Sequence, residues 1–296
     1  MRIGAHIHTS GGMETAARYA ADTGCECVQV FAKSPQSWHG PLKSADEVAA
    51  FLRALGELGI GPVFTHATYL INLGSEDDAL WSRSGAALAD ELVRAAAFEA
   101  AGVVVHMGTA YGTGRAENAA RVGEAVADAW RAAAAVCDPP PVLLENAAGA
   151  GRSYGRTPVQ LCDALEASRA LGADAGLCLD TCHGFAAGWD LRGPDGWADL
   201  CDALDERGHL GAVGLIHAND CKGELGEHRD RHAWIGEGGV GTAGFEAMFG
   251  ETRLHDVAVV VEMPGDPPVK DAENVARLRS LRDAAGAGGG PGRGDV

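Results

Sequence analysis

The feature that most constrains the fold is an alternation of short, β-branched runs with longer segments rich in Ala, Leu, Glu and Arg. Such alternation is typical of repeated strand–helix units with parallel strands. Eight such units predict an α/β fold whose strands close into one (β/α)₈ TIM barrel. The apolar runs are residues 3–8, 27–33, 61–67, 102–108, 141–148, 176–183, 212–220 and 257–264.

Between these runs lie amphipathic segments that we predict to be helices, clearest at 45–58, 79–101, 116–136, 158–171 and 271–285. A chain of 296 residues suits a single barrel, which typically takes about 250 residues. We therefore assign residues 1–283 to one domain. Residues 284–296 are mostly Gly and Ala, and we predict a disordered, Gly-rich C-terminal tail because they can bury little apolar surface.

Composition and the N-terminal pattern argue against a membrane or secreted protein. Hydrophobic residues make up 46% of the chain, but no apolar run is long enough to span a bilayer. The N-terminus enters a strand-like pattern at once and lacks the features of a signal peptide, so we expect a cytoplasmic protein. The eight cysteines form no CxxC pairs. We expect free thiols, with Cys178 and Cys182 buried in the core.

The net charge raises an objection to nucleic acid as a partner. The chain has 24 Lys and Arg against 41 Asp and Glu, a formal charge of −17, which disfavours nonspecific adhesion to phosphate. Bound divalent cations would remove this objection locally, because each adds two positive charges where carboxylates gather. The charge therefore does not exclude a DNA substrate.

Residues that can bind metals end six successive apolar runs. One His or Glu in such a position is commonly a hydrogen-bonded residue of the barrel rim. Six in the same register indicate a shared site, because strand ends meet at the mouth where active sites form. Imidazoles and carboxylates without clustered cysteines favour zinc, manganese or iron. The residues are His66, His106, Glu145, Asp180, His217 and Glu262, with His183 three positions after Asp180.

The long segment 222–241 adds the triplet Asp230-Arg231-His232. In an extended backbone Asp230 and His232 point to the same side, where they could hold one more ion. Two ions with open positions use roughly six to eight protein ligands. The nine candidates therefore indicate a third ion or a shared, bridging carboxylate.

Several strings of this sequence resemble those of the endonuclease IV family. They are Tyr69-Leu-Ile-Asn-Leu-Gly74, Glu145-Asn146, Asp180-Thr-Cys-His-Gly-Phe-Ala-Ala-Gly188, His217-Ala-Asn-Asp220 and Asp230-Arg-His232. The resemblance spans residues 3 to 283 and implies a xylose-isomerase-like TIM barrel that acts as an apurinic/apyrimidinic endonuclease in DNA repair. Such an enzyme hydrolyses the phosphodiester 5′ to an abasic site, leaving a 3′-hydroxyl and a 5′-deoxyribose phosphate. We also expect it to remove 3′-blocking groups.

The resemblance further implies how the nine candidates divide among three zinc ions, with Mn²⁺ or Fe²⁺ as alternatives at one or more sites. Two of the three sets share Glu145, which would bridge two ions. A hydroxide held between those ions would be the nucleophile, so Glu145 is the residue expected to matter most for catalysis. The sets are His66, His106 and Glu145; Glu145, Asp180, His217 and Glu262; and His183, Asp230 and His232.

Lesion recognition needs side chains that fill the gap left by the missing base. Tyr69 matches the family's tyrosine that enters the base stack, although a tyrosine followed by Leu-Ile could instead belong to the core. Where the family commonly has Lys-Asn-Gln-Arg-Gln-Trp, this chain reads Lys33-Ser-Pro-Gln-Ser-Trp38. Gln36 thus takes the place of an inserted arginine. We expect its shorter, neutral side chain to fill the gap less well.

Other expected contacts surround the ligands. Lys33, Lys222 and Arg231 are the basic residues expected to contact phosphate. His6 and His8, two positions apart on the first run, share a face toward the mouth. We expect these two histidines to contact ligands or substrate rather than to hold an ion.

Two other functions fit parts of this pattern. A metal-dependent sugar isomerase or epimerase of the same barrel class also carries Glu, Asp and His at strand ends, but it has no evident use for a third set of ligands. A non-catalytic, metal-dependent DNA-binding module has little need for so many open coordination positions. We therefore expect a monomeric hydrolase acting on double-stranded DNA with abasic sites or 3′-blocked ends, without an obligatory protein partner.

Overall fold

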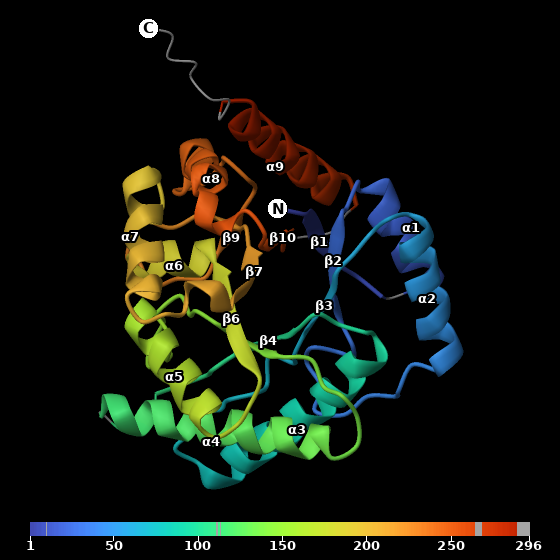
Figure 1. The fold of residues 1–296 in the computed structure, drawn as a ribbon, viewed down its shortest axis with the longest axis vertical. Helices are drawn as coiled ribbons and strands as arrows, with labels where there is room; N and C mark the ends of the chain where they lie inside the picture. Colours follow the sequence, from blue (N-terminus) through green and yellow to red (C-terminus); the bar gives the residue numbers. More distant parts are fainter. Residues whose placement is uncertain (10, 111, 113, 264–267, 289–296) are drawn as a thin grey trace, which may run out of the picture.

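Parallel strands form the wall of a closed barrel (Figure 1). The computed structural model describes residues 1–9, 11–110, 112, 114–263 and 268–288. Within these ranges the order around the barrel is β1-β10-β7-β6-β5-β4-β3-β2, which confirms the expected (β/α)₈ fold. The strands are β1 (Ile3–Ile7), β2 (Cys27–Phe31), β3 (Val63–His66), β4 (Val103–His106), β5 (Val142–Glu145), β6 (Ala175–Asp180), β7 (Val213–His217) and β10 (Ala258–Val261), with a separate antiparallel pair β8 (Asp220–Cys221) and β9 (His232–Ala233).

Helices surround the barrel on its outside (Figure 1). Several begin where the sequence offers a cap: Ser44 and Glu47 form a capping box, and the Asp77 and Thr157 side chains accept backbone N–H groups. No helix in the described ranges is long and apolar enough to cross a bilayer. The helices are α1 (Met13–Asp22), α2 (Ala45–Glu57), α3 (Asp78–Ala97), α4 (Arg115–Ala134), α5 (Pro158–Ala170), α6 (Thr181–Ala187), α7 (Pro194–Asp205), α8 (Gly241–Gly250) and α9 (Pro268–Gly288), with 3-10 turns at Leu210–Ala212 and Thr252–Leu254.

Two hydrophobic clusters follow from the alternation of side chains along each strand. The larger cluster packs strands against helices and includes Val105, Leu144 and, from α2 and α7, Phe51 and Trp197. The smaller cluster draws residues only from strands β2 to β7 and β10, so it fills the inside of the barrel. Its members are Cys27, Phe64, Val104, Leu143, Cys178, Leu215, Ala258 and Val260.

The strands are shorter than the expected runs, and two boundaries differ in the kind of structure found there. The run 176–183 is not one strand, because β6 ends at Asp180 and α6 follows at once. The Asp180 side chain accepts a hydrogen bond from the His183 backbone N–H at 2.7 Å and so caps α6. Helix α9 continues to Gly288, so the tail expected from 284 is helical at its start, since Ala-rich sequence readily extends an existing helix. Residues 289–296, and Pro264 at the expected end of the last run, lie outside the described residues.

Candidate metal centre

The nine side chains predicted as ligands gather at the C-terminal mouth of the barrel. Those on strand ends share one register, because each stands two residues after a member of the interior cluster and therefore also points inward. Their ligand-type atoms form three groups, and within each group all atoms lie within 4.8 Å of one another. The groups are His66, His106 and Glu145; Glu145, Asp180, His217 and Glu262; and His183, Asp230 and His232.

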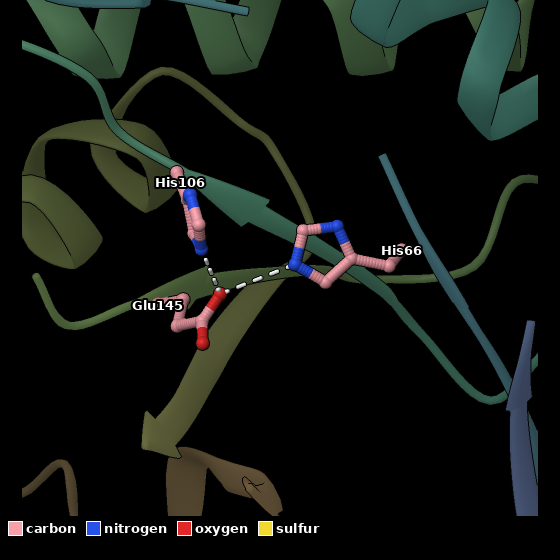
Figure 2. Close-up of side chains that lie close together, drawn as sticks. All are labelled: His66, His106 and Glu145. Atoms are coloured by element: carbon pink, nitrogen blue, oxygen red, sulfur yellow. Dashed lines mark hydrogen bonds and ion pairs between the residues drawn. The ribbon is translucent and has the colours of Figure 1, made fainter. Parts of the chain in front are cut away.

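In the first group two imidazoles converge on one carboxylate oxygen (Figure 2). His66 Nε2 lies 3.3 Å and His106 Nε2 lies 2.8 Å from Glu145 Oε2. The three residues end the neighbouring strands β3, β4 and β5, and His106 pairs with Glu145 in the sheet register. Neighbouring strands of the parallel barrel therefore bring these donors together without any loop.

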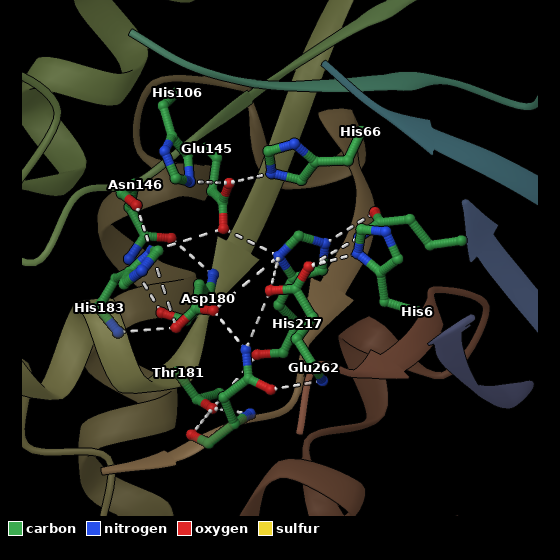
Figure 3. A network of polar contacts seen from close by, with 12 residues as sticks. His6, His66, His106, Glu145, Asn146, Asp180, Thr181, His183, His217 and Glu262 are labelled. Atoms are coloured by element: carbon green, nitrogen blue, oxygen red, sulfur yellow. Dashed lines mark hydrogen bonds and ion pairs between the residues drawn. The ribbon is translucent and has the colours of Figure 1, made fainter. Parts of the chain in front are cut away.

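The second group uses the other oxygen of the same carboxylate (Figure 3). His217 Nδ1 lies 2.8 Å from Glu145 Oε1, 3.3 Å from Glu262 Oε2 and 3.9 Å from Asp180 Oδ2. Asp180 and His217 are register partners on β6 and β7. Because its two oxygens face different groups, Glu145 is placed to bridge them.

The third group combines a helix with the long segment after β8. His183 lies in the first turn of α6, and its Nε2 is 3.2 Å from Asp230 Oδ2. Asp230 Oδ1 is in turn 3.1 Å from His232 Nε2. Asp230 and His232 thus converge on the same point, as the extended D-x-H triplet predicted.

A buried carboxylate organises the segment that carries Asp230 and His232. Asp220 accepts hydrogen bonds of 2.9 to 3.3 Å from backbone N–H groups within 236–241. Strand β8 pairs with β9 so that Cys221 lies opposite His232. A side chain at Gly238 would meet the Cys221 carbonyl oxygen at 2.3 Å, so glycine is required where this segment closes on β8. These contacts fix the backbone that presents the third group.

Hydrogen bonds to one ring nitrogen determine which nitrogen faces the centre in four of the five histidines. The Nδ1 atoms of His66, His183 and His232 lie 2.7 to 3.0 Å from the carbonyl oxygens of Ala67, Asn146 and Glu262. Carbonyls only accept, so each Nδ1 carries the proton and each Nε2 lone pair points inward. His217 is reversed, because its Nε2 lies 2.9 Å from Gln29 Oε1 and its Nδ1 faces the carboxylates.

The electrostatics of the site fit bound cations. Burial opposes ionisation of Glu145, but His106 and His217 hold its pKa well below the usual range. Burial likewise disfavours protonated His232, yet its hydrogen bond to Asp230 and the charge of Asp180 raise its pKa to about 9. Without metal, protons thus supply the positive charge that these carboxylates require. His232 Nε2 is buried and faces Asp230 Oδ1 at 3.1 Å, and five imidazoles with four carboxylates suit zinc, manganese or iron.

Three polar residues that the sequence analysis did not single out contact the predicted ligands Glu262 and Asp180. Gln29 Nε2 donates to Glu262 Oε1 at 2.9 Å. Asn219 Nδ2 donates to Asp180 Oδ2 at 2.6 Å, and Asn146 Nδ2 donates to the Asp180 carbonyl at 2.9 Å. Gln29 had a detectable signal, because it stands two residues after Cys27, in the same inward register as the ligands. The two asparagines neighbour ligands in the strings that carry the family resemblance.

The two N-terminal histidines differ from each other. His6 occupies the inward register of β1, and its Nδ1 lies 2.9 Å from Glu262 Oε1 (Figure 3). It therefore contacts one of the nine predicted ligands. His8 is exposed beyond the end of β1, and among the described residues no hydrogen bond or ion pair joins it to a ligand. A contact between His8 and substrate stays a prediction.

Of the residues expected to contact DNA, four are exposed. The Tyr69 side chain is 53% exposed, and its ring lies 5.5 Å from the His66 ring and 6.0 Å from that of His106. Tyr69 is therefore a residue of the mouth and not of the core. Gln36, Lys222 and Arg231 are also exposed.

Lys33 corrects the expected phosphate contact. Its side chain is only 1% exposed, and its Nζ lies 2.7 Å from Asp90 Oδ2 and 3.3 Å from Glu91 Oε1 on α3. The ammonium group is thus already neutralised inside the protein. Its partners lie 57 residues or more away in sequence, which local pattern does not reveal.

All eight cysteines are unpaired thiols, as expected, and Cys178 and Cys182 are buried. Cys178 lies within ligand distance of Glu145 and His217. Burial raises the pKa of its thiol to about 12, so the sulfur is protonated in metal-free protein. The oxygen and nitrogen donors remain the better set.

Comparison with known proteins gives a consistent result. Residues 17–283 match the family model described as xylose isomerase-like TIM barrel. The chain is 39% identical over 297 residues to the probable endonuclease 4 of Streptomyces coelicolor, covering 95% of each chain. It superposes on the endonuclease IV from Thermus thermophilus with a TM-score of 0.83 at 34% identity, covering 96% of this chain and 100% of that one.

Sugar epimerases share the fold at much lower identity. A D-tagatose 3-epimerase-like protein superposes with a TM-score of 0.69 at 16% identity, a likeness that extends to the barrel alone. The two endonucleases, in contrast, are more than one third identical to this chain over nearly the full length of both chains, which shows the family and not the fold alone. This chain belongs to the endonuclease IV family of xylose isomerase-like TIM barrels.

Proposed function

We propose that this protein is a DNA repair endonuclease that hydrolyses the phosphodiester 5′ to an abasic site in duplex DNA, leaving a 3′-hydroxyl and a 5′-deoxyribose phosphate. Three Zn²⁺ ions would serve the reaction, with Mn²⁺ or Fe²⁺ as alternatives, and the same site would remove 3′-blocking groups. The observation that carries the proposal is the third group, His183, Asp230 and His232, beside two groups that share Glu145. An enzyme with one or two ions does not need these donors.

When bound, the ions would make water a nucleophile at neutral pH and offset the negative charge of the reacting phosphate. The protein's own contribution is orientation. Backbone carbonyls and Gln29 hold four imidazoles with one nitrogen of each turned inward. Glu145 offers Oε2 to one group and Oε1 to the next. The geometry of two groups therefore depends on this one carboxylate.

The proposal also answers the objection raised by the net charge of −17. Four carboxylates line the centre, so three divalent ions leave the loaded mouth positive when the imidazoles are neutral. Phosphate would be attracted there, while the acidic remainder of the surface repels DNA. Binding would then be confined to the mouth of the barrel.

Lesion recognition would fall to exposed residues beside the centre. The Tyr69 ring lies against the His66 and His106 rings and could occupy the space of a missing base. Gln36 lies on the neighbouring loop, whose Pro35 carbonyl accepts a hydrogen bond from Tyr69 N at 3.0 Å. Lys222 and Arg231 are the exposed cations that would contact phosphate.

The proposal is tested with a duplex carrying one tetrahydrofuran abasic analogue. Zinc-loaded protein should nick it on the 5′ side, and a polymerase should extend the product because it ends in a 3′-hydroxyl. Glu145→Ala should lower the rate by at least about 10³-fold, since it removes a donor from two groups. Glu14→Ala, a change at an exposed carboxylate of α1, should leave nicking unchanged.

The main alternative is a sugar isomerase or epimerase, which the shared barrel alone does not exclude. Chemical analysis should find three metal ions per chain. Fully loaded protein that leaves the abasic duplex uncut but interconverts a ketose and an aldose would show that the nuclease proposal is wrong.

A further inference from the structure

The buried Lys33 side chain anchors the loop after β2, residues 33–41, to helix α3. Lys33 Nζ lies 2.7 Å from Asp90 Oδ2 and 3.3 Å from Glu91 Oε1, both on α3, and donates to the Trp38 carbonyl at 3.3 Å. Breaking a buried ion pair by removing one partner is strongly destabilising, because a charge is left without compensation. The cation therefore ties its own loop to the helix.

Glu91 extends the same tie to the loop after β3. Its Oε1 also accepts a hydrogen bond from Thr68 N at 3.1 Å. Thr68 Oγ1 donates to the Pro35 carbonyl at 2.6 Å, and Tyr69 N donates to the same carbonyl at 3.0 Å. The two loops are thus joined to each other directly, and both are joined to α3 through one carboxylate.

The far end of the β2 loop is held by a second cation. Arg94, which also pairs with Asp90, donates to the carbonyls of Gly40 and Pro41 at 2.8 and 3.0 Å. The Arg83 guanidinium lies 4.3 Å from the Trp38 ring centroid. The loop is therefore fixed along its length, while Gln36 at its tip stays exposed.

We infer that the Lys33–Glu91 ion pair is a positioning device that holds Gln36 and Tyr69 as one preformed DNA-facing surface. The inference rests on the proposed function, since it assigns these two loops to lesion binding. Ordering a mobile side chain on binding costs free energy, so a surface ordered beforehand binds more tightly. Lys33 and Glu91 thus determine affinity for the lesion and not the rate of bond cleavage.

The first test separates affinity from chemistry. Lys33→Met removes the charge but keeps most of the side-chain volume, and should raise KM for the abasic duplex about tenfold by loosening both loops. The value of kcat should change less than about twofold, because no donor of the centre moves. Glu91→Gln keeps an acceptor for Thr68 N and should have a smaller effect. The double variant should have the same KM as Lys33→Met, since both changes break the same Lys33–Glu91 contact.

Salt dependence distinguishes positioning from direct contact. A lysine bound to phosphate releases a counterion, so its loss lowers the slope of log affinity against log salt by about one. We expect the slope of Lys33→Met to equal that of the wild type. An unchanged KM in Lys33→Met, or a slope lower by about one, would overturn the inference.

Hydrogen exchange tests whether Lys33 holds the two loops in place, and the test does not depend on which substrate the enzyme cleaves. Exchange at the Thr68 and Tyr69 amides should accelerate about tenfold or more in Lys33→Met, because the carboxylate and carbonyl that bind them become mobile. The matched control is Glu26→Gln, which breaks the ion pair with Arg282 near the start of β2 and should leave those amides unchanged. Unaltered exchange in Lys33→Met contradicts the inference, whereas a wild type that never cuts abasic DNA contradicts only the proposed function.

Discussion

Two layers of side chains inside the barrel come from the same strands and differ in almost every physical property. Phe64, Leu143 and Leu215 belong to the lower layer and are apolar and buried. Two residues further along the same strands stand His66, Glu145 and His217, which are buried but ionisable. Two residues along each strand therefore separate the lower, apolar layer, which supports the fold, from the upper, ionisable layer, which forms the candidate metal centre.

The two layers also depend on their neighbours in different ways. A buried leucine gains from the removal of apolar area from water and needs no specific partner. A buried carboxylate or imidazolium is costly unless charges of opposite sign lie within reach. The upper layer is therefore interdependent, and disturbing one member should alter metal binding. Disturbing the lower layer should alter stability alone.

Leu215→Ala, in the lower layer, should have the largest energetic effect. Deleting this buried side chain leaves a cavity and should lower the free energy of unfolding by roughly 2–5 kcal/mol, measured by urea denaturation. Zinc content and kcat should stay at wild-type values. Leu58→Ala, at a position 52% exposed, is the matched control and should change little. Loss of metal in Leu215→Ala would show that the layers are not separable.

Asp220→Ala, beside the upper layer, should act on metal binding. Without this carboxylate the backbone of 236–241 loses its acceptor, so Asp230 and His232 are no longer presented to His183. On the proposed three-ion centre, we expect metal content to fall from three ions to two and nicking to slow roughly 10–100-fold, as for other residues that orient ligands. Glu237→Ala, an exposed change in the same segment, should retain all three ions. Full metal content in Asp220→Ala would contradict the assignment.

The pH dependence of zinc binding should also distinguish the layers. In metal-free protein the pKa of His232 is about 9, so at pH 7.5 the ring is protonated and zinc must displace that proton. Apparent affinity should rise about tenfold per pH unit for each proton released, and the contribution of His232 should level off above pH 9. Calorimetry in two buffers of different ionisation enthalpy measures this release. Equal heats in both buffers would exclude it.

The raised pKa of His232 also makes the stability of the metal-free fold depend on pH. Zinc affinity rises with pH, whereas this stability falls. Because the pKa is raised on folding, protonated His232 stabilises the fold fully below its unfolded pKa of about 6.5. That stabilisation is lost as the pH rises through 9. Thermal unfolding of metal-free protein across this range is the check, with zinc-loaded protein as the control.

Gln36→Arg, at the rim of the mouth, should have the smallest effect. The new cation lies outside both layers and should tighten binding to abasic duplex by about threefold to tenfold through contact with DNA. Fluorescence anisotropy on zinc-loaded protein with an uncleavable abasic duplex measures this, and kcat of the variant on a cleavable duplex should not change. An unchanged dissociation constant would mean that the departure from the family pattern at 36 has no bearing on DNA affinity.

Much of the upper layer was predictable because it obeys a local rule. An apolar run that ends in His, Glu or Asp identified His106, Glu145 and Glu262 as inward-facing donors. The rule missed Gln29, since a polar residue between two valines within a strand reads as an interruption rather than as a member of the layer. It also extended the sixth strand to His183, although Asp180 ends that strand by capping α6.

Lys33 shows where local rules fail. In sequence it is a basic residue after a strand, next to a loop that faces the substrate, and phosphate contact was a reasonable expectation. Its partners, Asp90 and Glu91, come from a helix whose position beneath the loop exists only after the barrel closes.

The sequence by itself determined the barrel, the family and the ligand types, because strand periodicity and residue chemistry are local properties that need only neighbouring residues to express them. Only the tertiary structure decided which ring nitrogen of each histidine faces the centre, that Glu145 serves two groups and that Lys33 is internal. Those properties depend on distances between strand ends, carbonyls and helices far apart in the chain, and such distances are set when the sheet closes and the helices pack around it.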